Sequence, residues 1–194
     1  FMMSNTNLPA SLATIAVARD SKRGRVSSYD RSGGNDDRIH IQPGETYEIC
    51  DIHGCGCINH IWFTLANDDV VEEKDYLRKS VLRMYWDGET EPSVLAPTGD
   101  FFGMGHAMCK NFVSEPLQMS PEDGRGFNCW FPMPFASEAR MTITNESSRE
   151  LLLYYYVDYE EYKTLPENML RFHAKWHREL PTQGVEESQF ASHR

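Results

Sequence analysis

This 194-residue sequence has no long hydrophobic run and few basic residues. No apolar stretch approaches the ~18 residues that a membrane-spanning helix needs, so we expect no membrane association. The 19 Lys and Arg residues are outnumbered by 29 Asp and Glu residues, which gives a formal net charge of -10. The only basic run is Lys22-Arg23-Gly24-Arg25, whereas binding to nucleic acid requires a broad basic face. The composition therefore excludes nucleic acid and predicts no membrane partner.

Cysteine is scarce as well: five residues are an odd number and too few for a disulfide scaffold. Thiols packed as small hydrophobic groups fit a reducing compartment. The apolar stretch from Leu12 to Val17 is short and has no charged segment before it, unlike a signal peptide. We therefore expect a cytoplasmic protein. A chain of this length can bury about 70% of its surface in one core, so its stability requires neither disulfides nor a structural metal.

The middle of the sequence has the pattern of an all-β protein. Short runs rich in β-branched and aromatic residues alternate with Gly, Pro, Asn and Asp, which is typical of an antiparallel β-sandwich or jelly roll. The eight predicted strands are Tyr47–Ile52, Ile58–Ala66, Val81–Trp86, Ser93–Ala96, Phe112–Met119, Phe127–Phe135, Arg140–Thr144 and Leu151–Tyr159. Asp87-Gly88 predicts a tight turn between two of them. Pro132 and Pro134 place their segment at an edge or a bulge, because proline cannot donate a ladder hydrogen bond.

Helices are predicted only at the two ends. Apolar residues at helical spacing predict a modest helix within residues 9–22, and Met169, Phe172, Trp176 and Leu180 predict a short one over residues 168–180. The polar stretch from Thr182 to Arg194 has no periodicity and is typical of a tail or linker. These patterns divide the chain into an N-terminal arm (1–24), a jelly-roll domain (25–165) and a final helix with its tail (166–194).

Residues 27–37 form the most unusual segment, because three carboxylates, an arginine and an asparagine surround two glycines. Glycine allows backbone conformations that let polar side chains converge on one small ligand. Asp and Asn suit the vicinal hydroxyls of a sugar, and arginine supplies a planar pair of donors. The alternative is a solvated loop in which aspartates cap turns. The segment lacks the Gly-Lys-Ser/Thr of a phosphate-binding loop, which argues against phosphoryl transfer.

A second loop, residues 97–105, places Asp100 between glycines and beside Phe101 and Phe102. It could present a carboxylate next to an apolar platform on which a sugar ring stacks. The alternative is that both rings plug the end of the sandwich and that Asp100 caps a turn.

Cysteine and histidine crowd together in residues 50–60, but their spacing does not match a tetrahedral zinc site. Strand alternation would also send Cys57 and His60 to opposite faces. We therefore predict no metal, with buried thiols and surface imidazoles instead. No Gly-x-Ser-x-Gly motif is present, so no nucleophilic triad is predicted.

Four segments in sequence order carry a resemblance to a known family: SSYDRSGGND (27–36), YWDGETEPSVLAPTGDFFG (85–103), NCWFPMPF (128–135) and the strand Tyr156–Tyr159. From about Leu8 to Pro181 the sequence resembles the amino-terminal half of glycoside hydrolase family 172, formerly a family of unknown function. The resemblance implies one half of a double jelly-roll subunit that assembles into trimers or dimers of trimers. It also implies exo-acting, retaining hydrolysis of α-D-fructofuranosides or α-D-arabinofuranosides near subunit contacts, without a cofactor.

The resemblance also assigns residues to a substrate site. Asp30, Arg31, Asn35 and Asp36 match one loop of the family, and Asp100, Phe101 and Phe102 match another, so these seven are the predicted substrate-binding residues. The family's catalytic glutamates lie in a glycine-rich motif of the second jelly roll, which does not occur in this sequence. The catalytic residues are therefore unassigned and expected in a second half or a partner chain. The alternative function is a non-catalytic module for carbohydrate binding or assembly.

Overall fold

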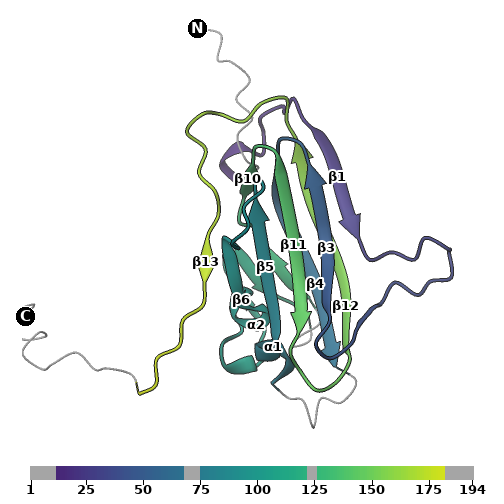
Figure 1. Ribbon diagram of the computed structural model, residues 1–194. Coiled ribbons are helices and arrows are strands. Elements are labelled where there is room, and N and C mark those ends of the chain that lie inside the picture. The colour runs from purple at the N-terminus through teal and green to yellow at the C-terminus, as the bar shows by residue number, and fades with distance from the viewer. Residues whose placement is uncertain (1–11, 68–74, 122–125, 182–194) are drawn as a thin grey trace, which may run out of the picture.

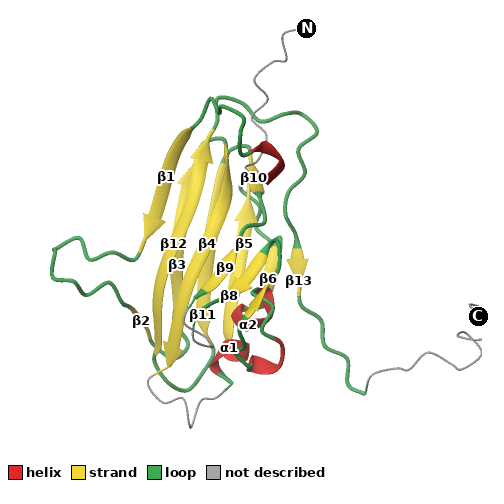
Figure 2. Cartoon of the chain, turned by 180° about the vertical axis from the view of Figure 1, so that it is seen from behind, coloured by secondary structure: helices red, strands yellow, loops and turns green. Residues whose placement is uncertain are grey.

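A computed structural model describes residues 12–67, 75–121 and 126–181, and within these residues the chain forms two β-sheets packed face to face (Figures 1 and 2). The fold is a β-sandwich, as the strand pattern predicted. The chain segment after the sandwich runs along one side of it, where β13 lies beside β6 (Figure 1).

The first sheet is antiparallel throughout its described strands. In spatial order these are β1 (Lys22–Ser27), β12 (Leu151–Glu161), β4 (Gly56–Asn67), β9 (Phe127–Cys129), β8 (Leu117–Met119) and β7 (Phe112–Val113). Two short strands extend this sheet, since β2 (Ile39–Ile41) pairs with β12 and β10 (Met133–Phe135) pairs with β4.

The second sheet has the spatial order β13 (Ala174–Lys175), β6 (Val94–Pro97), β5 (Ser80–Trp86), β11 (Glu138–Asn145) and β3 (Thr46–His53). Its pairs are antiparallel except for β13, which runs parallel to β6. Short helical turns precede or connect the strands: η1 (Leu12–Thr14) lies before β1, and α1 (Tyr76–Lys79), α2 (Thr98–Phe101) and η2 (Gly105–Ala107) lie between strands. None of the helices in the described residues is long and apolar enough to cross a bilayer.

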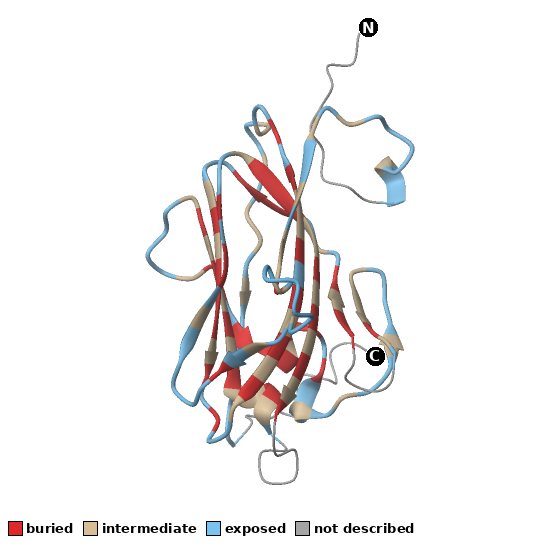
Figure 3. Cartoon of the chain, turned by 90° about the vertical axis from the view of Figure 1, so that its right-hand side faces the viewer, coloured by how far each residue is buried: buried red, intermediate tan, exposed pale blue. Residues whose placement is uncertain are grey.

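The core lies between the sheets and follows from alternation along the strands. In β12, Leu151, Leu153, Tyr155 and Val157 are buried, whereas the residues between them are partly or fully exposed. Buried and partly exposed positions alternate in the same way along β5 and along β4 from Ile61 onward (Figure 3). Each fully buried aliphatic side chain contributes roughly 1.5–3 kcal/mol relative to an exposed one.

All eight predicted strands are confirmed, two of them as pairs of shorter strands. The run 112–119 forms β7 and β8, and the run 127–135 forms β9 and β10. Among the described strands, β10 pairs with β4 alone, so the prolines do mark a sheet edge. Asp87 and Gly88 both have positive φ, 56° and 80°, and make the predicted turn after β5. The strands β1, β2 and β13 were not predicted; β2 and β13 are short, and β1 is rich in basic residues.

The predicted N-terminal helix is wrong within the described residues. Only Leu12–Thr14 is helical, as one 3-10 turn, and the sheet already begins at Lys22. Leu12 and Ile15 are more than three-quarters exposed, so the apolar face that would stabilise a helix is not covered by described residues. A short helix without such packing is marginal in water.

The predicted C-terminal helix is also wrong, because residues 168–180 are extended and contain β13. The backbone N–H groups of Ala174 and Trp176 donate to the carbonyls of Ser93 and Leu95 at the edge of β6. The indole of Trp86 donates to the Phe172 carbonyl at 2.7 Å. The open sheet edge offers these tertiary hydrogen bonds, which the helical spacing of the sequence does not reveal. The tail from residue 182 lies outside the described residues.

The arm before β1 is held by a buried ion pair. Arg19 Nε donates to Oε1 of Glu160 at 2.6 Å, and its Nη2 donates to Oε2. The hydroxyls of Tyr162 and Ser21 donate to the same carboxylate at 3.0 and 3.1 Å. Glu160 is only 3% exposed. The contact therefore joins the start of the described chain to the end of β12.

Candidate functional site

The predicted loop 97–105 folds as α2 followed by a tight turn. Gly99 is required there, because a Cβ atom would lie 2.9 Å from Leu77 Cβ and 3.2 Å from the Met104 carbonyl. Gly103 has a φ of +84°, which lets the chain turn back after Phe102. This close packing of α1 against α2 fixes the position of Asp100.

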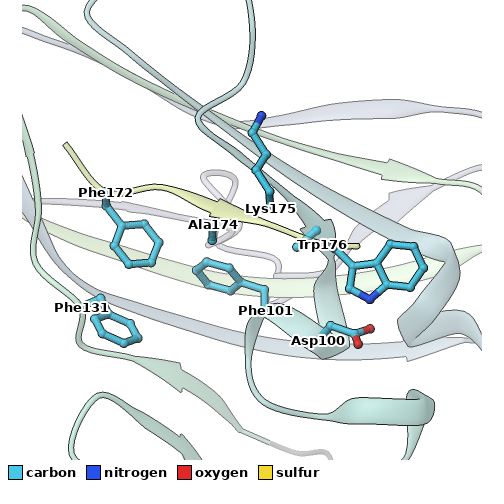
Figure 4. A pocket seen from close by; sticks show the side chains of 8 residues that line it. Asp100, Phe101, Phe131, Phe172, Ala174, Lys175 and Trp176 are labelled. Atoms are coloured by element: carbon cyan, nitrogen blue, oxygen red, sulfur yellow. The ribbon is translucent and has the colours of Figure 1, made fainter. Parts of the chain in front are cut away.

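Asp100 lies at one end of a cavity of about 200 Å³ (Figure 4). The lining residues come from β6, α2, the segment after β9 and the extended C-terminal segment: Ala96, Asp100, Phe101, Phe131, Phe172, Ala174, Lys175 and Trp176. Phe101, Phe131 and Phe172 gather at the other end, and Trp176 lies near Asp100 (Figure 4). The cavity is smaller than the ~300–1,000 Å³ of typical ligand pockets, so it suits a single small ring.

One hydrogen bond and one ion-pair contact from Arg78 hold the Asp100 carboxylate. Arg78 Nη2 donates to Oδ1 at 3.0 Å, and Nε lies 2.8 Å from Oδ2. The same guanidinium lies 5.2 Å from the centre of the Trp176 ring, close enough for a cation–π contact. The carboxylate is therefore fixed beside an indole that is 40% exposed, with its charge balanced.

Phe101 and Phe102 have different surroundings. Phe101 lines the cavity and packs edge-on against Phe172 at a centroid distance of 6.4 Å. Phe102 is fully buried and packs against Phe63 and Phe127. Phe102 therefore fills the end of the sandwich core, as the alternative interpretation of this loop predicted. Its ring supports the loop and is not accessible to a sugar.

The predicted loop 27–37 is exposed and organised around Asp30. The Asp30 carboxylate accepts hydrogen bonds from the backbone N–H groups of Ser32 at 2.8 Å and Asp36 at 3.3 Å. Hydrogen bonds from Ser32 and from the Asp36 backbone hold the pKa of Asp30 below its usual range. A Cβ atom on Gly34 would lie 2.7 Å from Asp30 Oδ2, so an alanine there would require the Asp30 side chain to move. Asp30 thus caps turns in an exposed loop, as the alternative interpretation of residues 27–37 predicted. The same hydrogen bonds hold the backbone from which the other side chains of the loop extend into solvent.

The other predicted residues of this loop point to solvent. Asp36 forms an exposed ion pair with Arg38 at 2.8 Å, and this hydrogen bond lowers the pKa of Asp36. Arg31 lies 5.7 Å from the centre of the Tyr29 ring, and Asn35 has a φ of 59° at the loop tip. These groups are accessible to a ligand from outside the chain.

The two predicted loops do not meet within this chain. The loop after β1 extends from one edge of the sandwich, whereas α2 lies beside β6 on the other side (Figures 1 and 2). Asp30 and Asp100 therefore cannot form one catalytic pair in a single copy. Any site that uses both loops requires another domain or another chain.

The cysteine and histidine cluster shows one clear departure from expectation. Asp158 pairs with His60 and Tyr159 with Ile58, so Asn59 is an extra residue in β4. This bulge puts Cys57 and His60 on the same face of the sheet, and the predicted split between faces is wrong. Among the described residues, no three His, Cys, Asp or Glu side chains are grouped as a metal site.

The thiols should differ in reactivity. Burial raises the pKa of Cys50, Cys57 and Cys129 to about 12, whereas Cys55 and Cys109 are only half-buried. We expect iodoacetamide to label Cys55 and Cys109 in the native protein and all five cysteines only in denaturant, because the thiolate is the reacting form. Mass spectrometry of the peptides measures this. Equal labelling of Cys57 and Cys55 in the native protein would contradict it.

Sequence reasoning missed Arg78 and assigned Trp176 to a helix. Arg78 lies 22 residues before Asp100 and belongs to no motif, so only the packing of α1 against α2 reveals the pair. For Trp176, the prolines at both ends of the final segment indicated a boundary but not its extended course.

Comparison with known proteins places the chain in a family. The model of the GH172 first beta-sandwich domain matches residues 19–177, which includes both sheets and the residues that line the cavity. No curated protein matches the chain. The chain therefore belongs to glycoside hydrolase family 172, and the matched part is the first β-sandwich domain of that family.

Proposed function

We propose that this sandwich supplies substrate-binding groups to a retaining exo-furanosidase acting on α-D-fructofuranosides or α-D-arabinofuranosides. The observation that carries the proposal is the cavity in which Asp100, fixed by Arg78, faces Trp176 and a set of phenylalanine rings. A furanose ring could pack on the aromatic end while its hydroxyls bind the carboxylate.

The hydrogen-bonding capacity of Asp100 supports this role. Each carboxylate oxygen can accept two hydrogen bonds, and Arg78 donates one hydrogen bond to Oδ1. Oδ1 therefore keeps a lone pair for a sugar hydroxyl. The guanidinium of Arg78 lies beside this carboxylate and balances its charge, which suits the binding of hydroxyl groups.

The catalytic carboxyls are assigned outside this sandwich. A retaining mechanism needs a nucleophile and an acid/base whose carboxyl groups are about 5–5.5 Å apart. Asp30 and Asp100 lie on different sides of the molecule, so they do not form this pair (Figure 1). We propose that a second sandwich domain or a partner chain supplies both groups. The assembly would be a homo-oligomer, either a trimer or a dimer of trimers.

The binding half of the proposal is tested by calorimetric titration with methyl α-D-arabinofuranoside. Asp100→Asn should weaken binding about tenfold or more, because a charge-assisted hydrogen bond contributes roughly 1.5–3 kcal/mol. Asp51→Asn is a matched control, since Asp51 lies on β3 at the far edge of the same sheet. Equal affinities for Asp100→Asn and the unmodified chain would refute a binding role for Asp100.

The catalytic half is tested with p-nitrophenyl α-D-arabinofuranoside. We expect negligible turnover by residues 1–194 and hydrolysis with retention when a domain carrying both glutamates is added. Rapid turnover by the 194-residue chain, abolished by Asp100→Asn, would show that the catalytic pair lies here. A chain that binds the sugar but gains no activity with any added domain would favour the non-catalytic carbohydrate-binding module instead.

A further inference from the structure

A cluster of aromatic and charged side chains occupies the outer face of the first sheet, away from the cavity at Asp100. Its members lie on β1, β12 and β4 and on or just after β9: Arg25, Tyr156, Asp158, His60, Trp62, Asn128 and Trp130. We call this the outer-face cluster. Register places Tyr156 opposite Trp62 and Asp158 opposite His60, so these side chains share one face.

Two pairs of stacked rings form the aromatic part of the cluster. Trp130 stacks on His60 with ring centres 5.1 Å apart and an interplanar angle of 10°. Trp62 stacks on Tyr156 at 5.0 Å and 27°. Trp130 is 36% exposed although His60 covers one side of its indole. The exposed part of the indole is an apolar surface directly after β9.

A hydrogen-bonded network fixes the polar part. Arg25 donates to both oxygens of Asp158, at 2.5 and 3.0 Å. The two ring nitrogens of His60 lie 3.1 Å from Asp158 Oδ2 and 3.0 Å from Asn128 Oδ1. Burial alone would raise the pKa of Asp158, but the hydrogen bonds from Arg25 and His60 outweigh it and lower this pKa. Asp158 and Arg25 keep 27% and 53% of their side chains exposed, so both can contact a ligand.

We propose that the outer-face cluster is a second carbohydrate site, which binds a pyranose unit of a glycan chain independently of the cavity at Asp100. The C–H face of a pyranose ring can pack against the exposed part of the Trp130 indole. Its vicinal hydroxyls match the carboxylate of Asp158 and the remaining N–H groups of Arg25.

The charge at the centre of the cluster favours a glycan over a protein partner. The buried centre of a protein interface is depleted of charged residues, and each partner buries roughly 800 Å². Here Asp158, Arg25 and His60 form the centre, and the aromatic rings flank them. Asp and Arg with adjacent aromatic rings can bind hydroxyls without losing their mutual hydrogen bonds.

The test is native affinity electrophoresis in gels that contain soluble xyloglucan, galactomannan or arabinogalactan. We expect at least one polysaccharide to retard the chain relative to serum albumin, and Trp130→Ala to weaken that retardation at least tenfold. Leu170→Ala is the matched control, because Leu170 is 83% exposed in the C-terminal segment and should leave retardation unchanged. Absence of retardation in all three gels, or equal retardation of Trp130→Ala, overturns the proposal.

Further variants separate the alternatives. Asp100→Asn should keep the retardation, and its loss in that variant would place binding in the cavity instead. Trp130→Phe keeps an aromatic ring and should bind with intermediate affinity, which tests the stack if Trp130→Ala does not fold. Sedimentation velocity gives the remaining outcome: if Trp130→Ala converts an oligomer into a monomer, the cluster is an interface between copies and the proposal fails.

Discussion

Replacing Glu160 with alanine is expected to lower the free energy of unfolding by about 3–5 kcal/mol, the usual cost of removing one partner from a buried ion pair. The variant leaves the Arg19 guanidinium, whose side chain is only 15% exposed, without its carboxylate. It also removes the acceptor for the hydroxyls of Tyr162 and Ser21. Chemical denaturation followed by tryptophan fluorescence measures the loss.

The control for this variant is Glu161→Ala, which removes the next carboxylate of β12 at an exposed position. A surface substitution of this kind should change the free energy of unfolding by no more than about 0.5 kcal/mol. Similar effects of the two variants would show that the ion pair does not anchor the arm.

The same carboxylate predicts how stability depends on acid. Burial raises the pKa of Glu160, but the hydrogen bonds from Arg19, Tyr162 and Ser21 outweigh it and lower this pKa in the folded state. Its contribution is therefore complete above the unfolded value of about 4.3 and is lost as pH falls through the folded pKa. In the Glu160→Gln variant, the free energy of unfolding should therefore fall less as the pH is lowered through this range. A profile identical to that of the unmodified chain would contradict the assignment.

The second large effect is expected from Gly56→Ala. Gly56 lies where β4 pairs with both β12 and β10, and an added Cβ atom would overlap the backbone carbonyl of Glu160. It would also lie 2.9 Å from the Phe135 ring. Because the clash involves backbone, β4 and β12 must move apart, and we expect a loss of about 3 kcal/mol, the upper part of the overpacking range.

Thermal and chemical unfolding measure this effect, with Gly105→Ala as the control. A Cβ atom on Gly105 would meet nothing within 4 Å, so that variant should stay within about 0.5 kcal/mol of the unmodified chain. Equal stability of the two variants would show that the ends of β4 and β12 separate without cost.

The sequence was most informative where structure depends on neighbouring residues. Alternation along a strand is a local property, so the run Leu151–Tyr159 predicted both the strand and its buried face. Asp87 and Gly88 predicted their turn because an Asp-Gly pair tolerates the positive φ that a tight turn needs. The runs 112–119 and 127–135 were each predicted as one strand but form two: β7 and β8 make a local hairpin, whereas β9 and β10 both pair with β4.

The sequence failed where a partner far along the chain decides the outcome. Residues 168–180 have helical spacing, yet the edge of β6 and the indole of Trp86 hold them extended. The bulge at Asn59 shifted the faces of Cys57 and His60, because register with β12 is a tertiary property.

For the candidate site, the sequence by itself determined the family, the two polar loops and Asp100, since motifs are written in consecutive residues. Only the tertiary structure brought Arg78 and Trp176 to Asp100, placed Phe102 in the core and separated Asp30 from Asp100. The outer-face cluster likewise depends on strand order, which sets β1, β12, β4 and β9 side by side. The reason is the same in each case: contacts between distant segments follow from the pairing and packing of whole sheets, which no local pattern encodes.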